Sequence, residues 1–292
     1  MDEAVPIRET TQMTALKTTV RRLVPRPAWQ ALAKAKAHTL DAVDGLLGRR
    51  DALTPPRSAR FIGSGAYTEI GNEFLGHFTT LGGLTPDSRV LDVGCGQGRM
   101  AVPLLRYLSG AGSYDGFDIV STGIDWCRAN ISASHENFRF HHADIRNEEY
   151  NPGGSCAAAE YRFPFDDASF DLVFLTSIFT HMRPVEVAHY LAEIARVLKP
   201  GGRCLVTWFL LNAESRALIA ANRAELSFVY EIDGCLITNK DVPEEAIAHP
   251  QEIVEAMYAE AGLSLAPVRY GAWCGRTTFL SYQDICVATR PD

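Results

Sequence analysis

Long apolar runs are missing from this sequence of 292 residues. No stretch approaches the ~20 consecutive apolar residues of a membrane-spanning helix. The N-terminal residues 1–14 carry charges where a secretory signal has an apolar core. We therefore expect no integral membrane segment and a cytoplasmic location.

Cysteine pairs and metal-ligand clusters are also missing. The seven cysteines stand singly, with no Cys-x-x-Cys pair and no Cys/His cluster at zinc spacing. We expect reduced thiols and no metal site. Lysine is scarce, and none of the five lysines lies four residues after a tyrosine. Because short-chain dehydrogenases need a Tyr-x-x-x-Lys pair, a nicotinamide-dependent oxidoreductase is the weaker alternative.

Charge is unevenly distributed along the chain. Residues 1–60 carry eleven Lys or Arg against six Asp or Glu, so the remainder of a chain with net charge −7 has a surplus of −12. Since nucleic-acid binding depends on basic contacts to phosphate, this acidic remainder argues against a nucleic-acid partner. A small-molecule substrate is the expectation.

Residues 1–60 have the periodicity of helices rather than strands. Met13, Leu16, Val20 and Leu23 recur on one helical face, and a second amphipathic stretch follows Pro27. We predict a basic helical extension over 1–60. It either packs on the rest of the protein or contacts a partner or a membrane surface.

Residues 61–292 are predicted to form one α/β domain. A helix over 61–84 precedes a region, 85–209, in which short β-rich runs alternate with helical segments, as in a parallel sheet with crossover helices. We expect strands at 89–93, 113–118, 137–142, 170–176 and 203–209, and helices at 99–109, 122–133 and 184–198.

The remainder of the domain has a different pattern. Residues 210–250 are predicted to be a lid insertion, and 251–292 a helix followed by strands at 263–270 and 281–289. Their ten-residue connection is too short for a crossover helix, so these two strands should pair antiparallel. The sequence thus predicts a Rossmann-like, seven-stranded, mostly parallel sheet with a terminal antiparallel hairpin, helices on both faces and an N-terminal helical extension.

A glycine-rich turn follows the first predicted strand, in the sequence V-L-D-V-G-C-G-Q-G-R over 90–99. Gly94, Gly96 and Gly98 alternate, and Asp92 lies two residues before the first of them. This spacing differs from the G-x-G-x-x-G of dinucleotide folds. A carboxylate at that position suits a ligand that carries an ammonium group and suits a pyrophosphate poorly.

This turn resembles motif I of the class I S-adenosylmethionine-dependent methyltransferases. Four further segments are similar to this family in the same order: Y-D-G-F-D over 114–118, F-H-H-A-D-I over 140–145, F-P-F-D-D-A-S-F-D-L-V over 163–173 and L-K-P-G-G over 198–202. The resemblance implies S-adenosylmethionine as cofactor and S-adenosylhomocysteine as product. Residues 1–60 lie outside it.

The resemblance also assigns cofactor contacts. Asp118 would accept hydrogen bonds from both ribose hydroxyls, and Asp144 from the adenine amino group. Ile119 and Ile145 would pack on the two adenine faces. The methionine moiety would be held by the glycine turn, Asp92 and the main chain near Thr176.

His181 is the candidate catalytic residue, because it follows the fourth strand near the expected methyl position. Histidine can accept a proton near neutral pH. The alternative is a structural residue that braces its loop. A base is optional in this chemistry, since the sulfonium already activates the methyl group and alignment alone accelerates such a reaction.

Four residues are expected near the substrate. Tyr67 lies on the helix before the first strand, Tyr230 in the predicted lid, and Trp273 and Arg276 in the loop after the strand at 263–270. Arg276 could bind an anionic group, or it could pair with a surface acid. Trp273 could stack on substrate or pack in the hairpin core.

These features predict methyl transfer to a small-molecule acceptor, with oxygen favoured by elimination as the methylated atom. A non-catalytic cofactor-binding regulator or scaffold is the alternative. It would bind the nucleoside without turnover.

Overall fold

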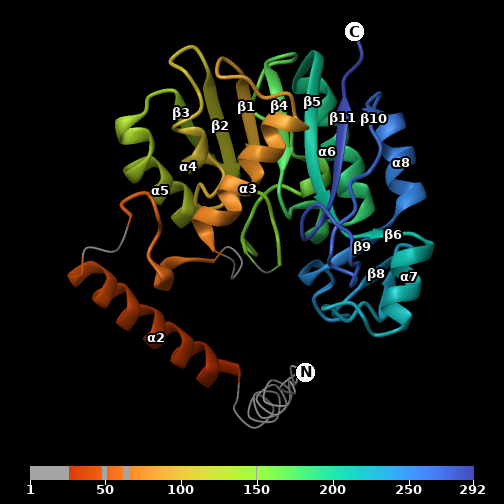
Figure 1. The fold of residues 1–292 in the computed structure, drawn as a ribbon, viewed down its shortest axis with the longest axis horizontal. Coiled ribbons are helices and arrows are strands. Elements are labelled where there is room, and N and C mark those ends of the chain that lie inside the picture. Colours follow the sequence, from red (N-terminus) through yellow and green to blue (C-terminus); the bar gives the residue numbers. More distant parts are fainter. Residues whose placement is uncertain (1–25, 48–50, 62–65, 149) are drawn as a thin grey trace, which may run out of the picture. The chain divides into compact units, whose positions relative to one another are not determined.

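The computed structural model describes residues 26–47, 51–61, 66–148 and 150–292 (Figure 1). The chain divides into two compact units, Met1–Gly63 and Ser64–Asp292. The first amphipathic stretch of the predicted extension, within residues 1–25, lies outside the described residues.

The described residues of the first unit include the long helix α2 (Arg26–Leu46) and the short 3-10 helix η1 (Arg57–Ala59). Asp41 accepts hydrogen bonds from the backbone amides of Arg57 and Ser58 at 2.8 and 2.9 Å. Arg57 also forms an ion pair with Asp44 at 2.9 Å. These contacts fold the segment after α2 back onto the C-terminal half of the helix.

The second unit is built on a seven-stranded sheet with the order β10-β11-β5-β4-β1-β2-β3. Five strands are parallel, whereas β11 is antiparallel to β5 and β10 is antiparallel to β11. This confirms the predicted fold class. The strands are β1 (Arg89–Val93), β2 (Ser113–Asp118), β3 (Phe138–His142), β4 (Phe170–Leu175), β5 (Leu198–Trp208), β10 (Ser264–Leu265) and β11 (Asp284–Thr289).

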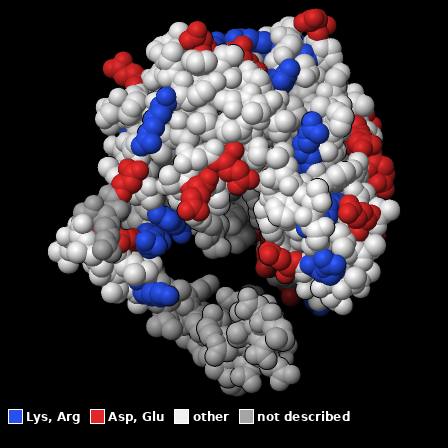
Figure 2. All heavy atoms as spheres, viewed as in Figure 1, with Lys and Arg blue, Asp and Glu red and all other residues white. Residues whose placement is uncertain are grey.

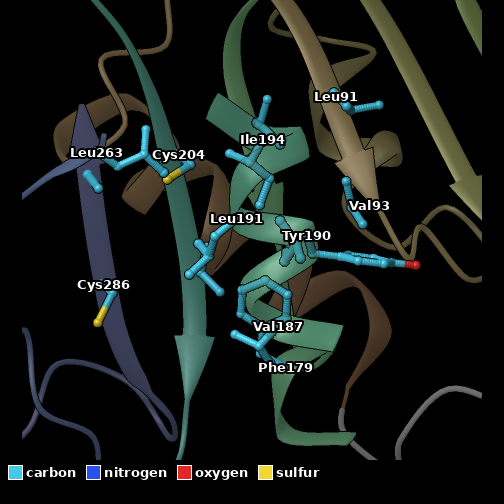
Figure 3. Close-up of a cluster of buried hydrophobic side chains, with 14 of the residues drawn as sticks. Leu91, Val93, Phe179, Val187, Tyr190, Leu191, Ile194, Cys204, Leu263 and Cys286 are labelled. Carbon is cyan, nitrogen blue, oxygen red and sulfur yellow. The ribbon is translucent and has the colours of Figure 1, made fainter. Parts of the chain in front are cut away.

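Both faces of this sheet are covered by helices. On one face, α6 (Pro184–Val197) and α8 (Gln251–Glu260) contribute to the main apolar core together with β1, β4, β5 and β11 (Figure 3). On the other, Phe78 of α3 (Tyr67–Thr80) stacks on Phe174 of β4 at 4.1 Å. Because the central strands are buried on both faces, they are apolar along most of their length.

The crossover helices on the β1–β3 side are shorter than predicted. The helix expected over 99–109 is wrong in extent, since α4 covers only Ala101–Leu104. Beyond it the amides of Arg106 and Tyr107 bond to carbonyls three residues back, so the chain continues in 3-10 turns. The next helix, α5, covers Ser121–Asn130.

The terminal hairpin is antiparallel as predicted, but its first strand is short. The expected strand at 263–270 stops at Leu265, and only an isolated bridge at Arg269 resumes the pairing. The register shifts by one residue between Ala266, whose amide donates to the Val287 carbonyl, and Arg269, which pairs with Ile285. The second strand begins at Asp284 rather than 281.

Residues 210–250 form a second, four-stranded sheet with the order β6-β9-β8-β7. Because β6 follows β5 directly, this small sheet is attached at the carboxyl ends of the parallel strands (Figure 1). Its elements are β6 (Leu210–Leu211), α7 (Ala213–Ala220), β7 (Tyr230–Ile232), β8 (Cys235–Ile237), η5 (Pro243–Glu245) and β9 (Ile247–Pro250), and the remaining 3-10 helices are η2 (Ser132–Ser134), η3 (Ala158–Glu160) and η4 (Phe179–His181). None of the helices in the described ranges combines the length and apolar composition that a membrane crossing requires.

Candidate functional site

The carboxyl ends of the parallel strands bring the predicted cofactor residues to one edge of the sheet. Asp92 lies near the end of β1, Asp118 ends β2, and Thr176 follows β4 directly. Asp144 lies two residues beyond β3. In open α/β sheets this edge is where ligands bind.

The glycine turn is held close to its neighbours. Gly94, Gly96 and Gly98 have φ values of 80°, 53° and 75°, a region that favours glycine. The carbonyl of Phe117 accepts hydrogen bonds from the amides of Gly94 and Cys95. A Cβ at Gly94 would lie 2.1 Å from the side chain of Ile178, so this position requires glycine because Ile178 packs against its backbone.

Asp92 is buried behind the turn with one carboxylate oxygen unsatisfied. The hydroxyl of Tyr114 donates to Asp92 Oδ2 at 2.7 Å, whereas Oδ1 has no partner. Burial raises the pKa of Asp92 to about 8, against the opposing effect of the Tyr114 hydrogen bond. The carboxyl is therefore mostly protonated at neutral pH, and a nearby cation would favour its ionisation.

Asp118 joins the glycine turn to the end of β2. Its two oxygens accept hydrogen bonds from the amides of Gly96 and Val120, both at 2.8 Å. Burial raises its pKa, and these backbone donors oppose that effect. Since each carboxylate oxygen can accept more than one hydrogen bond, Asp118 retains capacity for a ligand.

Asp144 is exposed at the rim of the site. The hydroxyl of Ser155 donates to it at 2.6 Å, and this hydrogen bond lowers its pKa. Ile119 is half-buried and packs against the main core. The side chain of Ile145 is fully within that core, so the structure gives it a packing role as well as a place beside Asp144.

His181 lies at the end of η4, on the loop after β4. Its Nδ1 is 2.8 Å from the carbonyl oxygen of Glu244 in η5. Because a carbonyl only accepts, Nδ1 carries the proton and Nε2 is left with a lone pair. This is the tautomer that a general base using Nε2 requires.

Ser177 occupies a strained position next to Thr176 that sequence reasoning missed. Its φ is 63°, although it is not a glycine. The Ser177 amide donates to Thr207 Oγ1 at 2.7 Å, Thr207 donates to Gln283 Oε1 at 2.6 Å, and Gln283 Nε2 donates to Ser177 Oγ at 3.0 Å. This closed ring of hydrogen bonds joins β4, β5 and the start of β11.

Known proteins are similar to this region in sequence and in fold. A family model described as a methyltransferase domain matches residues 90–202. The chain is 35% identical over 119 residues to phthiotriol/phenolphthiotriol dimycocerosates methyltransferase 1 of Mycobacterium ulcerans, covering 41% of this chain and 36% of that protein. It is 34% identical over 133 residues to a fatty-acid O-methyltransferase of Mycolicibacterium smegmatis, covering 46% and 41% respectively.

A solved structure from Pyrococcus horikoshii has a TM-score of 0.55 and 19% identity, and the match covers 80% of this chain and 94% of that one. Residues 90–202 are a methyltransferase domain, and these matches support a class I S-adenosylmethionine-dependent methyltransferase. The chain spans about two fifths of the length of the two curated relatives named above.

Two of the predicted substrate residues of this methyltransferase domain, Tyr67 and Tyr230, differ in how far they are buried. Tyr67 is buried, and its hydroxyl donates to the carbonyl of Gln97 in the glycine turn at 2.7 Å. It therefore links α3 to that turn. Tyr230 is 43% exposed on β7 of the small sheet.

The other two are buried in the methyltransferase domain rather than lining an open surface. Trp273 is fully buried with Phe209 and Phe228, which is the hairpin-core alternative. Arg276 forms ion pairs with Glu214 at 2.8 Å and with Asp284 at 3.0 Å. Of the two readings of Arg276, these contacts favour pairing with protein acids.

Asp284 is the centre of this buried group and was missed by sequence reasoning. It is fully buried and accepts four hydrogen bonds, from Leu210 N, Gly271 N, Trp273 Nε1 and Arg276 Nη1. A single acid at the head of an apolar run, D-I-C-V-A, is the signal that could have revealed it, because a buried carboxylate needs partners.

Proposed function

We propose that this chain transfers a methyl group from S-adenosylmethionine to a small-molecule acceptor, with oxygen as the favoured methylated atom. The observation that supports it best is Asp92 Oδ1, a buried oxygen without a partner behind a turn of three glycines with positive φ. A ligand with an ammonium group would satisfy that oxygen. A diphosphate offers no such hydrogen-bond donor.

The residues at this edge fit the cofactor. When bound, it supplies an electrophilic methyl group on a sulfonium. Asp92 and the glycine turn would hold the amino-acid end, with the main chain near Thr176. Asp118 and Asp144 would accept from the ribose and the adenine, and Ile119 and Ile145 would pack beside the base.

A small acceptor is supported by charge and by the two curated relatives named above. One relative is named a fatty-acid O-methyltransferase, which favours oxygen as the methylated atom. Residues 61–292 are acidic, and on the face drawn in Figure 2 the Lys and Arg side chains of the described residues are dispersed among Asp and Glu. That pattern does not suit a nucleic-acid strand, which requires a continuous basic track.

His181 would act as the base when the acceptor is a hydroxyl. Its Nε2 would take the hydroxyl proton as the acceptor oxygen receives the methyl group that the bound cofactor would supply. The Glu244 carbonyl holds the ring by Nδ1 and stabilises the resulting imidazolium. An acceptor that is already a carboxylate has no proton to lose and would not need this residue.

Replacing His181 by alanine is expected to lower turnover of a hydroxyl acceptor by about 10²–10⁴-fold, the usual contribution of a general base. Affinity for S-adenosylhomocysteine should stay within experimental error. His189→Ala is the matched control, because His189 also contacts a carbonyl, that of Tyr161 at 2.9 Å, but lies on α6 rather than on the loop after β4. Full turnover in His181→Ala would make His181 a structural residue.

Calorimetry tests the cofactor assignment. S-adenosylmethionine and S-adenosylhomocysteine should bind, whereas NAD should not. Because the ligand's ammonium favours the Asp92 carboxylate, binding should lower the raised pKa of this residue and release a proton. Affinity should therefore increase with pH, by up to about tenfold per unit, until pH reaches the pKa of about 8 that burial gives Asp92.

Asp92→Asn is the control for this titration, since an amide cannot ionise. It should bind more weakly and lose most of the pH dependence. Tight binding of NAD, or a wild-type affinity that falls as pH rises from neutral to the pKa of Asp92, would contradict the assignment. Cofactor binding without turnover on any acceptor would favour the regulator or scaffold alternative.

A further inference from the structure

A short segment before β11 exposes apolar side chains beside the candidate site. Phe279, Leu280 and Tyr282 are 55%, 45% and 42% exposed, whereas Ser281 between them is buried. Single exposed apolar residues are normal, but a contiguous group next to a site indicates a binding surface. We refer to Phe279, Leu280 and Tyr282 as the apolar row.

The backbone under the apolar row is fixed by hydrogen bonds. Ser281 Oγ donates to Glu73 of α3 at 2.6 Å, although the two residues are 208 positions apart in the sequence. The amide of Leu280 donates to the carbonyl of Tyr270 at 3.2 Å. The row is therefore presented in one arrangement, and a ligand that binds it need not order a loose segment.

The row continues directly into the polar part of the site. Tyr282 precedes Gln283, whose Nε2 donates to Ser177 Oγ at 3.0 Å. Ser177 Oγ also lies 3.4 Å from Thr180 Oγ1, and the proton of this exposed hydroxyl can be donated either to that oxygen or to a ligand. The ring of Tyr282 packs on Phe209 and its hydroxyl bonds to Glu225. The surface therefore changes from the hydrogen-bonding groups beside Thr176, through Tyr282, to the apolar side chains of Phe279 and Leu280.

We propose that the acceptor is an amphiphile with a polar reacting end and an extended apolar tail. The polar end contacts Ser177 and Gln283, and the tail lies over the apolar row. This inference rests on the proposed methyl transfer and names the class of its acceptor. Three partly exposed side chains fall well short of the roughly 1,000 Å² that a stable protein interface buries, which favours a small ligand over a partner protein.

The test is a chain-length series of probes. Octanoate, decanoate and dodecanoate, kept below their micelle concentrations, are titrated by calorimetry into the full chain saturated with S-adenosylhomocysteine. Affinity should rise with each added methylene, by up to about fourfold if the methylene becomes fully buried. The double variant Phe279→Ser, Leu280→Ser should lose most of that increase.

Ile253→Ser is the matched control. Ile253 on α8 is 45% exposed, the same fraction as Leu280, but lies outside the row. This variant should show the same increase of affinity with chain length as the wild type. Thermal unfolding of all variants checks that they are folded, which substitutions of exposed side chains should permit.

The outcomes separate this inference from the proposed function. Equal affinity for the three acids, or an unchanged increase of affinity with chain length in the double variant, would overturn the proposal that the acceptor is an amphiphile. Binding to phosphatidylcholine vesicles that depends on the row, without any series for the monomeric acids, overturns it in favour of a membrane surface. Formation of S-adenosylhomocysteine from S-adenosylmethionine is scored separately: a chain-length series without product supports the amphiphile and counts against methyl transfer.

Discussion

Replacing Asp118 by alanine is expected to weaken binding of S-adenosylhomocysteine by two orders of magnitude or more. The side chain would lose its hydrogen bonds to the ribose, and hydrogen bonds to a charged group contribute roughly 1.5–3 kcal/mol each. The substitution would also leave the amides of Gly96 and Val120 without their acceptor. It would thereby loosen the glycine turn that would hold the amino-acid end of the cofactor. Calorimetry of the purified variant measures the loss.

Two further substitutions make this result specific. Asp118→Asn keeps an oxygen for a backbone amide but removes the charge, so its affinity should lie between wild type and alanine. Asp125→Ala, an exposed acid on the adjoining α5, should bind like wild type. An unchanged affinity in Asp118→Ala would refute the ribose assignment, even if the chain binds the cofactor.

The sheet and the glycine turn could be predicted because their signals are local. Alternation of β-rich and helical segments predicted the parallel strands, and Gly94, Gly96 and Gly98 mark a backbone conformation that other residues rarely adopt. The short β10 had no such signal, because it ends where its pairing with β11 shifts by one residue between Ala266 and Arg269.

The geometry around Ser177 and His181 could not be predicted in the same way, because it depends on residues that are far away in the sequence. Ser177 has a positive φ although it is not a glycine, so its sequence does not indicate this conformation. Its hydrogen bonds go to Thr207 in β5 and to Gln283 just before β11. Similarly, the proton position on His181 is set by Glu244 in the small sheet region. No pattern within one segment contains such information.

The buried acid of the hairpin should have the largest effect on stability. Asp284→Ala removes the acceptor of four hydrogen bonds and leaves the Arg276 guanidinium without its buried partner. Breaking a buried ion pair from one side costs about 3–5 kcal/mol. For a domain of this size each kcal/mol corresponds to about 2–4 °C, so thermal unfolding should occur roughly 6–20 °C lower.

A charge-removal experiment distinguishes this cause from simple loss of packing. If the unpaired guanidinium is responsible, Asp284→Ala combined with Arg276→Met should unfold at a higher temperature than Asp284→Ala alone, because the buried charge is gone. Asp171→Ala is the control, since its ion pair with Lys199 at 2.7 Å is partly exposed and should contribute at most about 1 kcal/mol. Equal unfolding temperatures for Asp284→Ala and Asp171→Ala would show that the hairpin and small sheet are held by their apolar core instead. Their attachment to β5 would then depend on Phe209 and Trp273, which pack at 5.0 Å, rather than on the buried charges.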